Sequence, residues 1–226
     1  MPSSQTIRRG PFLVVSAVLA SLVGAAGFLG APACVRPTPQ GPMITARFED
    51  NFEREQLGGE WNATGNMWTI DQGALRVSGA RNHPLWLRRR IPRNAHIEFD
   101  AWSSTDEGDL KCEVYGDGRS FAQQDSYTAT SYVVIFGGWH NQLNVIARMD
   151  EHASDRRVRR GPRVVPGQHY HWVVERRDRT LTWSIDGQPM LEFNDPEPLA
   201  GRGHEYFAFN NWNVEAHFDN LVIQPL

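Results

Sequence analysis

Hydrophobic and polar residues alternate along most of the last quarter of the chain. Apolar side chains recur at every second position over residues 170–175, 180–185 and 190–193, and two further runs follow over 206–209 and 214–223. Turn residues such as Asp186-Gly187 separate the runs. Period-2 alternation bounded by such turns is typical of β-hairpins, and no window here repeats with the helical period. We therefore predict a β meander whose last run, 214–223, lies inside a sheet.

The same alternation predicts strands earlier in the chain. Residues 67–77 form a predicted hairpin that turns at 71–73, and further strands are predicted over 93–102, 108–118, 131–136 and 143–150. In the strand 93–102, Ile97, Phe99 and Ala101 face one way, and Glu98 and Asp100 face the other. The pattern therefore indicates an all-β domain with little helix.

Two motifs near the C-terminus carry a resemblance. The pattern Leu-x-Trp-x-Ile-Asp-Gly occupies residues 181–187, and Phe-Asp-Asn-Leu-x-Ile occupies 218–223. This ending resembles the concanavalin A-like lectin/glucanase superfamily, which includes laminin G-like modules and family-16 glucanases, and the likeness extends back to Phe48. It implies a single jelly-roll sandwich of two antiparallel sheets. It does not fix an activity, because lectins, enzymes and adhesion modules share this fold.

The N-terminus has the pattern of a bacterial export signal. Arg8 and Arg9 precede an apolar stretch over 11–33, and a Pro-rich segment follows. We predict a signal peptide over 1–34, a tether over 35–45 and the sandwich over 46–226. The predicted signal peptide and tether together place the domain in the bacterial cell envelope, at the outer membrane or in the periplasm.

Cys34 ends the apolar stretch and resembles the lipidated cysteine of a lipobox, although Ala31 stands where leucine is usual. Three outcomes remain open: lipidation of Cys34, plain cleavage, and an uncleaved anchor, since the stretch 11–33 is long enough to span a bilayer. The second cysteine, Cys112, alternates with Leu110 and Val114, which favours a small buried hydrophobe over a reactive thiol.

Composition and charge narrow the partners. The chain has 226 residues and a formal net charge of −3, and without Arg8 and Arg9 it carries about −5. A nucleic-acid partner is therefore not expected, because such proteins present a basic face. We expect a monomer. The arginine-rich run 156–163 favours a solvated loop over docking on an anionic surface.

The resemblance also implies a calcium site. In glucanase-like relatives a first-strand acid, a carbonyl near the following turn and a last-strand aspartate can hold a structural Ca²⁺, and Glu49, Gly73 and Asp219 occupy these places. Hard oxygen ligands of this kind suit Ca²⁺. The alternative is that these acids are solvated or bonded to turn amides.

Glu98 and Asp100 begin the acidic strand pattern of family-16 glucanases, but no second glutamate follows in 101–105. Glu113 shares a polar strand face with Asp109 and Lys111, and on a neighbouring strand it would converge with Glu98 and Asp100 as the carboxylate pair that glycosidases need. The alternative is a solvated strand face.

Aromatic and amide side chains gather in two loops. Trp139, His140 and Asn141 lie at one predicted loop tip, and Asn210, Asn211 and Trp212 lie at another. Aromatic rings stack on sugars and amides bond their hydroxyls, so we expect carbohydrate binding there. Three hypotheses follow: a carbohydrate-binding domain, a glycoside hydrolase with paired carboxylates, and a structural envelope lipoprotein without a small ligand.

Overall fold

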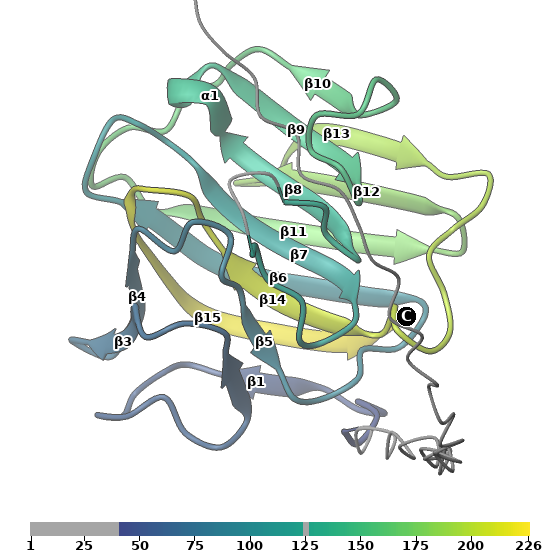
Figure 1. Cartoon of the computed structure of the whole chain (residues 1–226), viewed down its shortest axis with the longest axis horizontal. Coiled ribbons are helices and arrows are strands. Elements are labelled where there is room, and N and C mark those ends of the chain that lie inside the picture. Colours follow the sequence, from purple (N-terminus) through teal and green to yellow (C-terminus); the bar gives the residue numbers. More distant parts are fainter. Residues whose placement is uncertain (1–40, 124–126) are drawn as a thin grey trace, which may run out of the picture. The chain divides into compact units, whose positions relative to one another are not determined.

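The computed structural model describes residues 41–123 and 127–226, which form two antiparallel β-sheets packed face to face (Figure 1). Within these ranges the helical segment is the short turn α1 (Gly138–Asn141), and no helix is long and apolar enough to cross a membrane. The predicted leader, with Cys34, lies outside the described residues. The prediction of an all-β fold with two antiparallel sheets is confirmed.

The larger sheet has eight strands. Its order is β13 (Gln188–Asn194), β12 (Thr180–Ile185), β11 (Tyr170–Arg177), β6 (Ala95–Ser103), β15 (Glu215–Pro225), β4 (Ala74–Ser78) and β3 (Trp68–Asp71), and β1 (Phe48–Asp50) also pairs with β15. The last strand therefore lies inside the sheet, as its apolar pattern predicted. The predicted hairpin at 71–73 is confirmed as β3 and β4.

The smaller sheet has seven strands. Its order is β10 (Arg157–Arg159), β9 (Leu143–Arg148), β8 (Tyr132–Gly137), β7 (Leu110–Gly116), β14 (Tyr206–Asn210), β5 (Leu85–Leu87) and β2 (Trp61–Ala63). The short turn α1 joins β8 to β9 at one end of this sheet (Figure 1).

The predicted meander is correct only for its first three strands. β11, β12 and β13 are neighbours in the chain and in the sheet, but β14 belongs to the other sheet, where it pairs with β7. Asp195, just after β13, accepts hydrogen bonds from Tyr132 (2.6 Å) and Arg148 (3.0 Å) of the seven-stranded sheet. The chain thus crosses between sheets after β13, which strand alternation alone does not encode.

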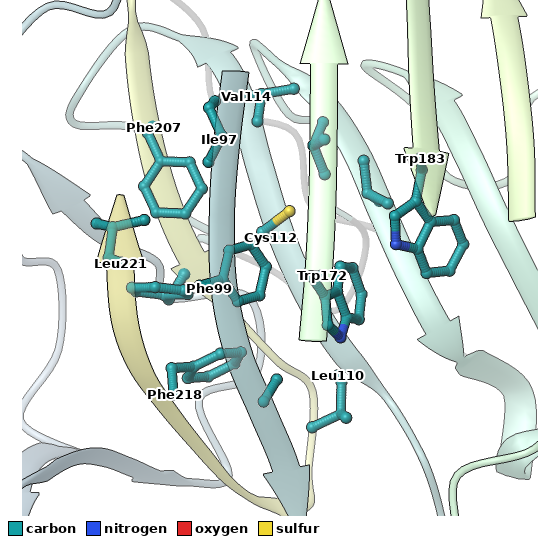
Figure 2. Packing of buried hydrophobic residues seen from close by; sticks show 14 of the residues in the cluster. Ile97, Phe99, Leu110, Cys112, Val114, Trp172, Trp183, Phe207, Phe218 and Leu221 are labelled. Atoms are coloured by element: carbon teal, nitrogen blue, oxygen red, sulfur yellow. The ribbon is translucent and has the colours of Figure 1, made fainter. Parts of the chain in front are cut away.

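The space between the sheets is filled by aromatic and aliphatic side chains. Figure 2 shows Phe99, Phe218, Phe207 and Trp172 in this cluster, with Cys112 among them. Phe99 meets Phe209 edge to face at 5.2 Å, and Phe209 stacks on Phe218 at 4.4 Å. Cys112 is fully buried, and burial raises the pKa of its thiol, which confirms the prediction of a small buried hydrophobe.

Residues 41–45, which we predicted to lie in the tether, pack on the sandwich instead. Ile44 is in the core and its backbone N–H donates to the Arg90 carbonyl at 2.9 Å. The backbone N–H of Gly41 donates to the Tyr206 hydroxyl at 3.3 Å. Residues 41–45 therefore contribute contacts to the sandwich.

Candidate functional site

A cleft of about 630 Å³ opens on the outer face of the seven-stranded sheet. Alternation along β7 directs Cys112 and Val114 into the core, so Lys111 and Glu113 face the other way. Ile135 of β8 and Tyr127, both members of a second apolar cluster, line the cleft beside Lys111. The outward face of β7, for which a solvated surface was the alternative prediction, is therefore enclosed by loops.

The floor of the cleft is a charged cluster centred on Lys111. Its ammonium donates to Asn82 Oδ1 and to Glu151 Oε2, both at 3.1 Å, and lies 3.7 Å from Asp109 Oδ1. Burial alone would lower the pKa of Lys111, but the negative charges of Asp109 and Glu151 outweigh burial and raise it. Lys111 therefore stays charged although its side chain is buried.

Glu113 lies fully buried in the same outer layer of the sheet. Its carboxylate accepts hydrogen bonds from Tyr127 (3.1 Å), Ser131 and Asn210 (2.7 Å). Burial nevertheless raises the pKa of Glu113 to about 7, because these bonds and the Lys111 charge offset only part of the lost hydration.

Asp109 joins the floor to the rim. Its carboxylate accepts the backbone N–H of Trp212, whose ring lines the cleft and is 39% exposed. Burial raises the pKa of Asp109 more than the nearby Lys111 charge lowers it.

The opposite part of the rim is the turn α1, which has an unusual backbone. Trp139, His140 and Asn141 have φ angles of 54°, 56° and 59°, so three consecutive non-glycine residues are left-handed. Such residues cost about 1–2 kcal/mol each. The turn brings Trp139 and His140 to the cleft, and His140 Nδ1 lies 2.7 Å from Glu107 Oε2.

Asn141 holds this turn and does not line the cleft. Its amide donates to the carbonyls of Asp106 (2.8 Å) and Val164 (2.7 Å), and its carbonyl oxygen accepts the Val164 N–H (2.8 Å). The side chain is buried, so we assign it to the turn and not to sugar contact.

Asn210 and Asn211 are likewise buried and bonded within the protein. Asn210 donates to Glu113, and Asn211 accepts the Ala80 N–H at 3.0 Å and donates to the Val214 carbonyl at 2.7 Å. They fix the segment that carries Trp212. Of the six predicted sugar contacts, the structure brings Trp139, His140 and Trp212 together at the cleft.

The convergence that we expected of Glu98, Asp100 and Glu113 does not occur. Glu98 and Asp100 are on β6 of the eight-stranded sheet, whereas Glu113 is on β7 of the seven-stranded sheet. Their side chains point to opposite outer faces, because Phe99 and Cys112 occupy the core between them. Glu98 and Asp100 instead bond to His96 (3.1 Å) and His171 (2.9 Å).

The three residues of the predicted calcium site differ in their surroundings. The Glu49 side chain is exposed and pairs with Arg47. Gly73 has a φ of 78°, and a Cβ there would stand 2.7 Å from Glu53 Oε2. Burial, together with the negative charges of Asp100 and Glu53, raises the pKa of Asp219. Among the described residues, no group of three or more His, Cys, Asp or Glu side chains has an arrangement that could hold a metal ion.

Several cleft residues were not predicted as site residues. Asp109 and Lys111 could have been found from the sequence, since charged residues alternate with core residues on β7 and so share one face. Asn82 comes from one loop, and Glu151 and His152 come from another loop far from it in the sequence. Their meeting depends on the tertiary fold and has no local signal.

No protein-family model and no curated protein sequence matches this chain. Solved structures do match. A prokaryotic β-1,3-1,4-glucanase (lichenase) from a mouse hindgut metagenome aligns with a TM-score of 0.58 and 9% identity, covering 80% of this chain and 100% of that one. The β-glucanase of Bacillus licheniformis aligns with a TM-score of 0.54 and 11% identity, covering 80% and 99%. These structures share the β-sandwich fold of this chain.

One more solved structure with a similar fold is a binding module and not an enzyme. A carbohydrate-binding module from Bacillus subtilis aligns with a TM-score of 0.55 and 14% identity, covering 73% of this chain and 95% of that one. At these identities the similarity concerns the fold alone.

Proposed function

We propose that the protein is an exported carbohydrate-binding domain that holds a glycan in the cleft on the seven-stranded sheet. The observation that carries the proposal is the composition of the cleft, in which the rings of Trp139 and Trp212 border a floor of fixed polar groups. Aromatic faces stack on sugar rings, and the polar groups can bond sugar hydroxyls.

The backbone of α1 supports this proposal. Three left-handed residues in a row are costly, and such strain persists where the surrounding structure imposes it, commonly at ligand sites. Here the strained residues include Trp139 and His140, whose side chains line the cleft. Similarity of the fold to a carbohydrate-binding module and to glucanases is in keeping with the same function.

A glycan array probed with the purified full chain tests the proposal. We expect Trp212→Ala to weaken retention by about two- to tenfold, since a stacked ring contributes about 0.5–1.5 kcal/mol. The matched control is Trp102→Ala, because Trp102 lies on the outer face of the other sheet, stacked between His169 and His217. An intact fold that retains no glycan would contradict the proposal and favour the structural lipoprotein.

We also propose that Cys34 tethers the domain to the cell envelope. The apolar stretch before it and the Pro-rich segment after it support a lipoprotein signal. Cys34→Ser should move the protein from the membrane fraction to the soluble fraction and abolish labelling with a radioactive fatty acid. If the signal is cleaved without lipidation, Cys34→Ser changes neither the fraction that contains the protein nor its fatty-acid labelling.

A second candidate function, glycoside hydrolysis, is favoured by one specific observation. Glu151 Oε2 and Asp109 Oδ1 lie 3.1 and 3.7 Å from the same Lys111 nitrogen. The two carboxylate oxygens are therefore at most 6.8 Å apart, a limit that includes the separation of about 5–5.5 Å found between the carboxyl groups of retaining glycosidases. If this pair is catalytic, the wild type releases reducing ends from a retained glycan and Glu151→Gln does not. If the protein only binds glycans, the wild type releases no reducing ends either.

Calcium binding remains a proposal, and Glu53 is a better ligand candidate than Glu49. Glu53 lies against Gly73, and its charge acts on Asp219, whereas Glu49 pairs with Arg47. Together, Glu53, Gly73 and Asp219 would supply the hard oxygens that Ca²⁺ prefers. Calcium should raise the melting temperature and a chelator should reverse the rise, with no response in Asp219→Asn.

A further inference from the structure

The floor of the cleft holds more negative than positive charge. The carboxyl groups of Asp109 and Glu151 both lie against the Lys111 ammonium, and the Glu113 carboxyl lies behind them. At the rim, Glu107 lies beside His140, and the Arg156 guanidinium lies 4.8 Å from the centre of the Trp139 ring. His152 lines the same rim. With the histidines neutral, the rim charges balance and the floor keeps an excess of negative charge.

Lys111 is poorly placed to serve an incoming anion. Its ammonium donates to Asn82 and Glu151 and lies 3.7 Å from the Asp109 carboxylate, so its charge is already matched within the protein. A sulfate or uronate group that approached this ammonium would also meet the carboxylates of Asp109 and Glu151. The cleft therefore disfavours acidic glycans.

A cationic ligand group would relieve the imbalance. An unmatched charge in a partly dehydrated site is costly, and an ammonium that donates to a carboxylate replaces the lost hydration. Asp109 and Glu151 are suited to accept it, because their side chains keep 14% and 15% exposure and line the cleft.

We propose that the cleft selects glycans that carry a free amine, with the sugar ring at the tryptophans and its ammonium at Asp109 and Glu151. This inference rests on the proposed carbohydrate-binding function and adds the class of sugar. A hexosamine unit fits both parts of the cleft, because one residue provides an apolar ring face and a cation a few bonds apart.

Isothermal titration of the full chain at pH 6.5 tests the proposal with three trisaccharides: the glucosamine trimer, the N-acetylglucosamine trimer and cellotriose. We expect the glucosamine trimer to bind about tenfold tighter than the other two, as one charge-assisted hydrogen bond provides. The advantage should fall by about tenfold in Asp109→Asn and in Glu151→Gln. Two variants are used so that a folding defect in one, checked by circular dichroism, does not decide the result.

Glu192→Gln is the matched control, because it removes an exposed carboxylate of β13 on the other sheet. It should leave the preference unchanged. Equal or tighter binding of the N-acetylated trimer or of cellotriose would overturn the amine preference and leave carbohydrate binding intact. Tighter binding of trilysine than of the glucosamine trimer would assign the cleft to basic peptides, and no binding of any sugar would contradict both proposals.

Discussion

The outer faces of the two sheets have similar sequences and different environments. On β6 and β11, His96, Glu98, Asp100 and His171 point outward, bond one another and stay partly exposed. On β7 the equivalent outward positions, Lys111 and Glu113, are buried under loops. The same alternation of charged and core residues thus produces a self-paired surface on one side and a dehydrated, unbalanced site on the other. What distinguishes them is the loop cover and not the strand pattern.

Removing the central cation should show the largest difference between the two faces. Lys111→Met leaves the partly buried carboxyl groups of Asp109 and Glu151, and the fully buried one of Glu113, without an ammonium, which should destabilise the fold by about 3–5 kcal/mol. Denaturant unfolding measures this. Arg76→Met is the control on the other face, where the half-exposed ion pair with Glu215 predicts a loss below about 1 kcal/mol. Equal losses would mean that the burial of Lys111 has no energetic consequence.

Glu113 should make stability depend on pH. Its pKa in the folded state is about 7 and its ordinary value is 4.5. The folded state therefore binds a proton that the unfolded state has released, so the free energy of unfolding falls by about 3 kcal/mol as pH rises from about 4.5 to about 7. Unfolding titrations at several pH values should show this decline in the wild type and its absence in Glu113→Gln. A variant with the same slope as the wild type would disprove the assignment.

Relaxing the strained turn should stabilise the protein and weaken binding. Glycine adopts left-handed φ angles without penalty, so His140→Gly should raise the free energy of unfolding by about 1 kcal/mol. His152 lines the same cleft, also exposed, but does not have a positive φ. His152→Gly should therefore lower stability by about 0.5–1 kcal/mol. Thermal unfolding compares the two, and a loss in both would show that α1 carries no strain.

The smallest effect is expected on the open face. Burial alone would lower the pKa of His96, but Glu175 and Glu98 outweigh burial and raise it. This pair of contacts contributes stability below the ordinary pKa of 6.5, and the contribution is lost as pH rises through the raised value. His96→Gln should thus cost less than about 1 kcal/mol at pH 5.5 and nothing at pH 9. A constant loss at both pH values would assign His96 a packing role.

Much of the fold was predictable from the sequence, because the pattern of apolar residues reflects a two-sided environment. The alternation of Ile97, Phe99 and Ala101 predicted the core face of β6, and the turn residues at 71–73 predicted the hairpin of β3 and β4. The sheet to which β14 belongs was not predictable, since either face-to-face layer accepts the same alternation. That choice depends on contacts such as Tyr132 to Asp195, which are distant in the chain.

The site was predictable only where a loop presents its side chains directly. Trp139, His140 and Trp212 were expected at a binding surface, and the structure places them at one cleft. Asn141 and Asn211 belong to the same loops but fix the backbone, and the sequence does not distinguish an amide that bonds a ligand from one that bonds a carbonyl. The Lys111 cluster combines residues from three separate segments, so it could not be foreseen.

The position of β15 has a consequence for how the chain matures. This strand is the last to be synthesised, yet β6 lies along one side of it while β1 and β4 follow one another along the other. Without β15, the eight-stranded sheet is divided into three parts, namely the four strands from β13 to β6, the β3–β4 hairpin and β1, so a nascent chain cannot complete its native contacts. Contacts between the first and last strands also make folding slow. The eight-stranded sheet can therefore form in full only after residues 215–225 have been synthesised.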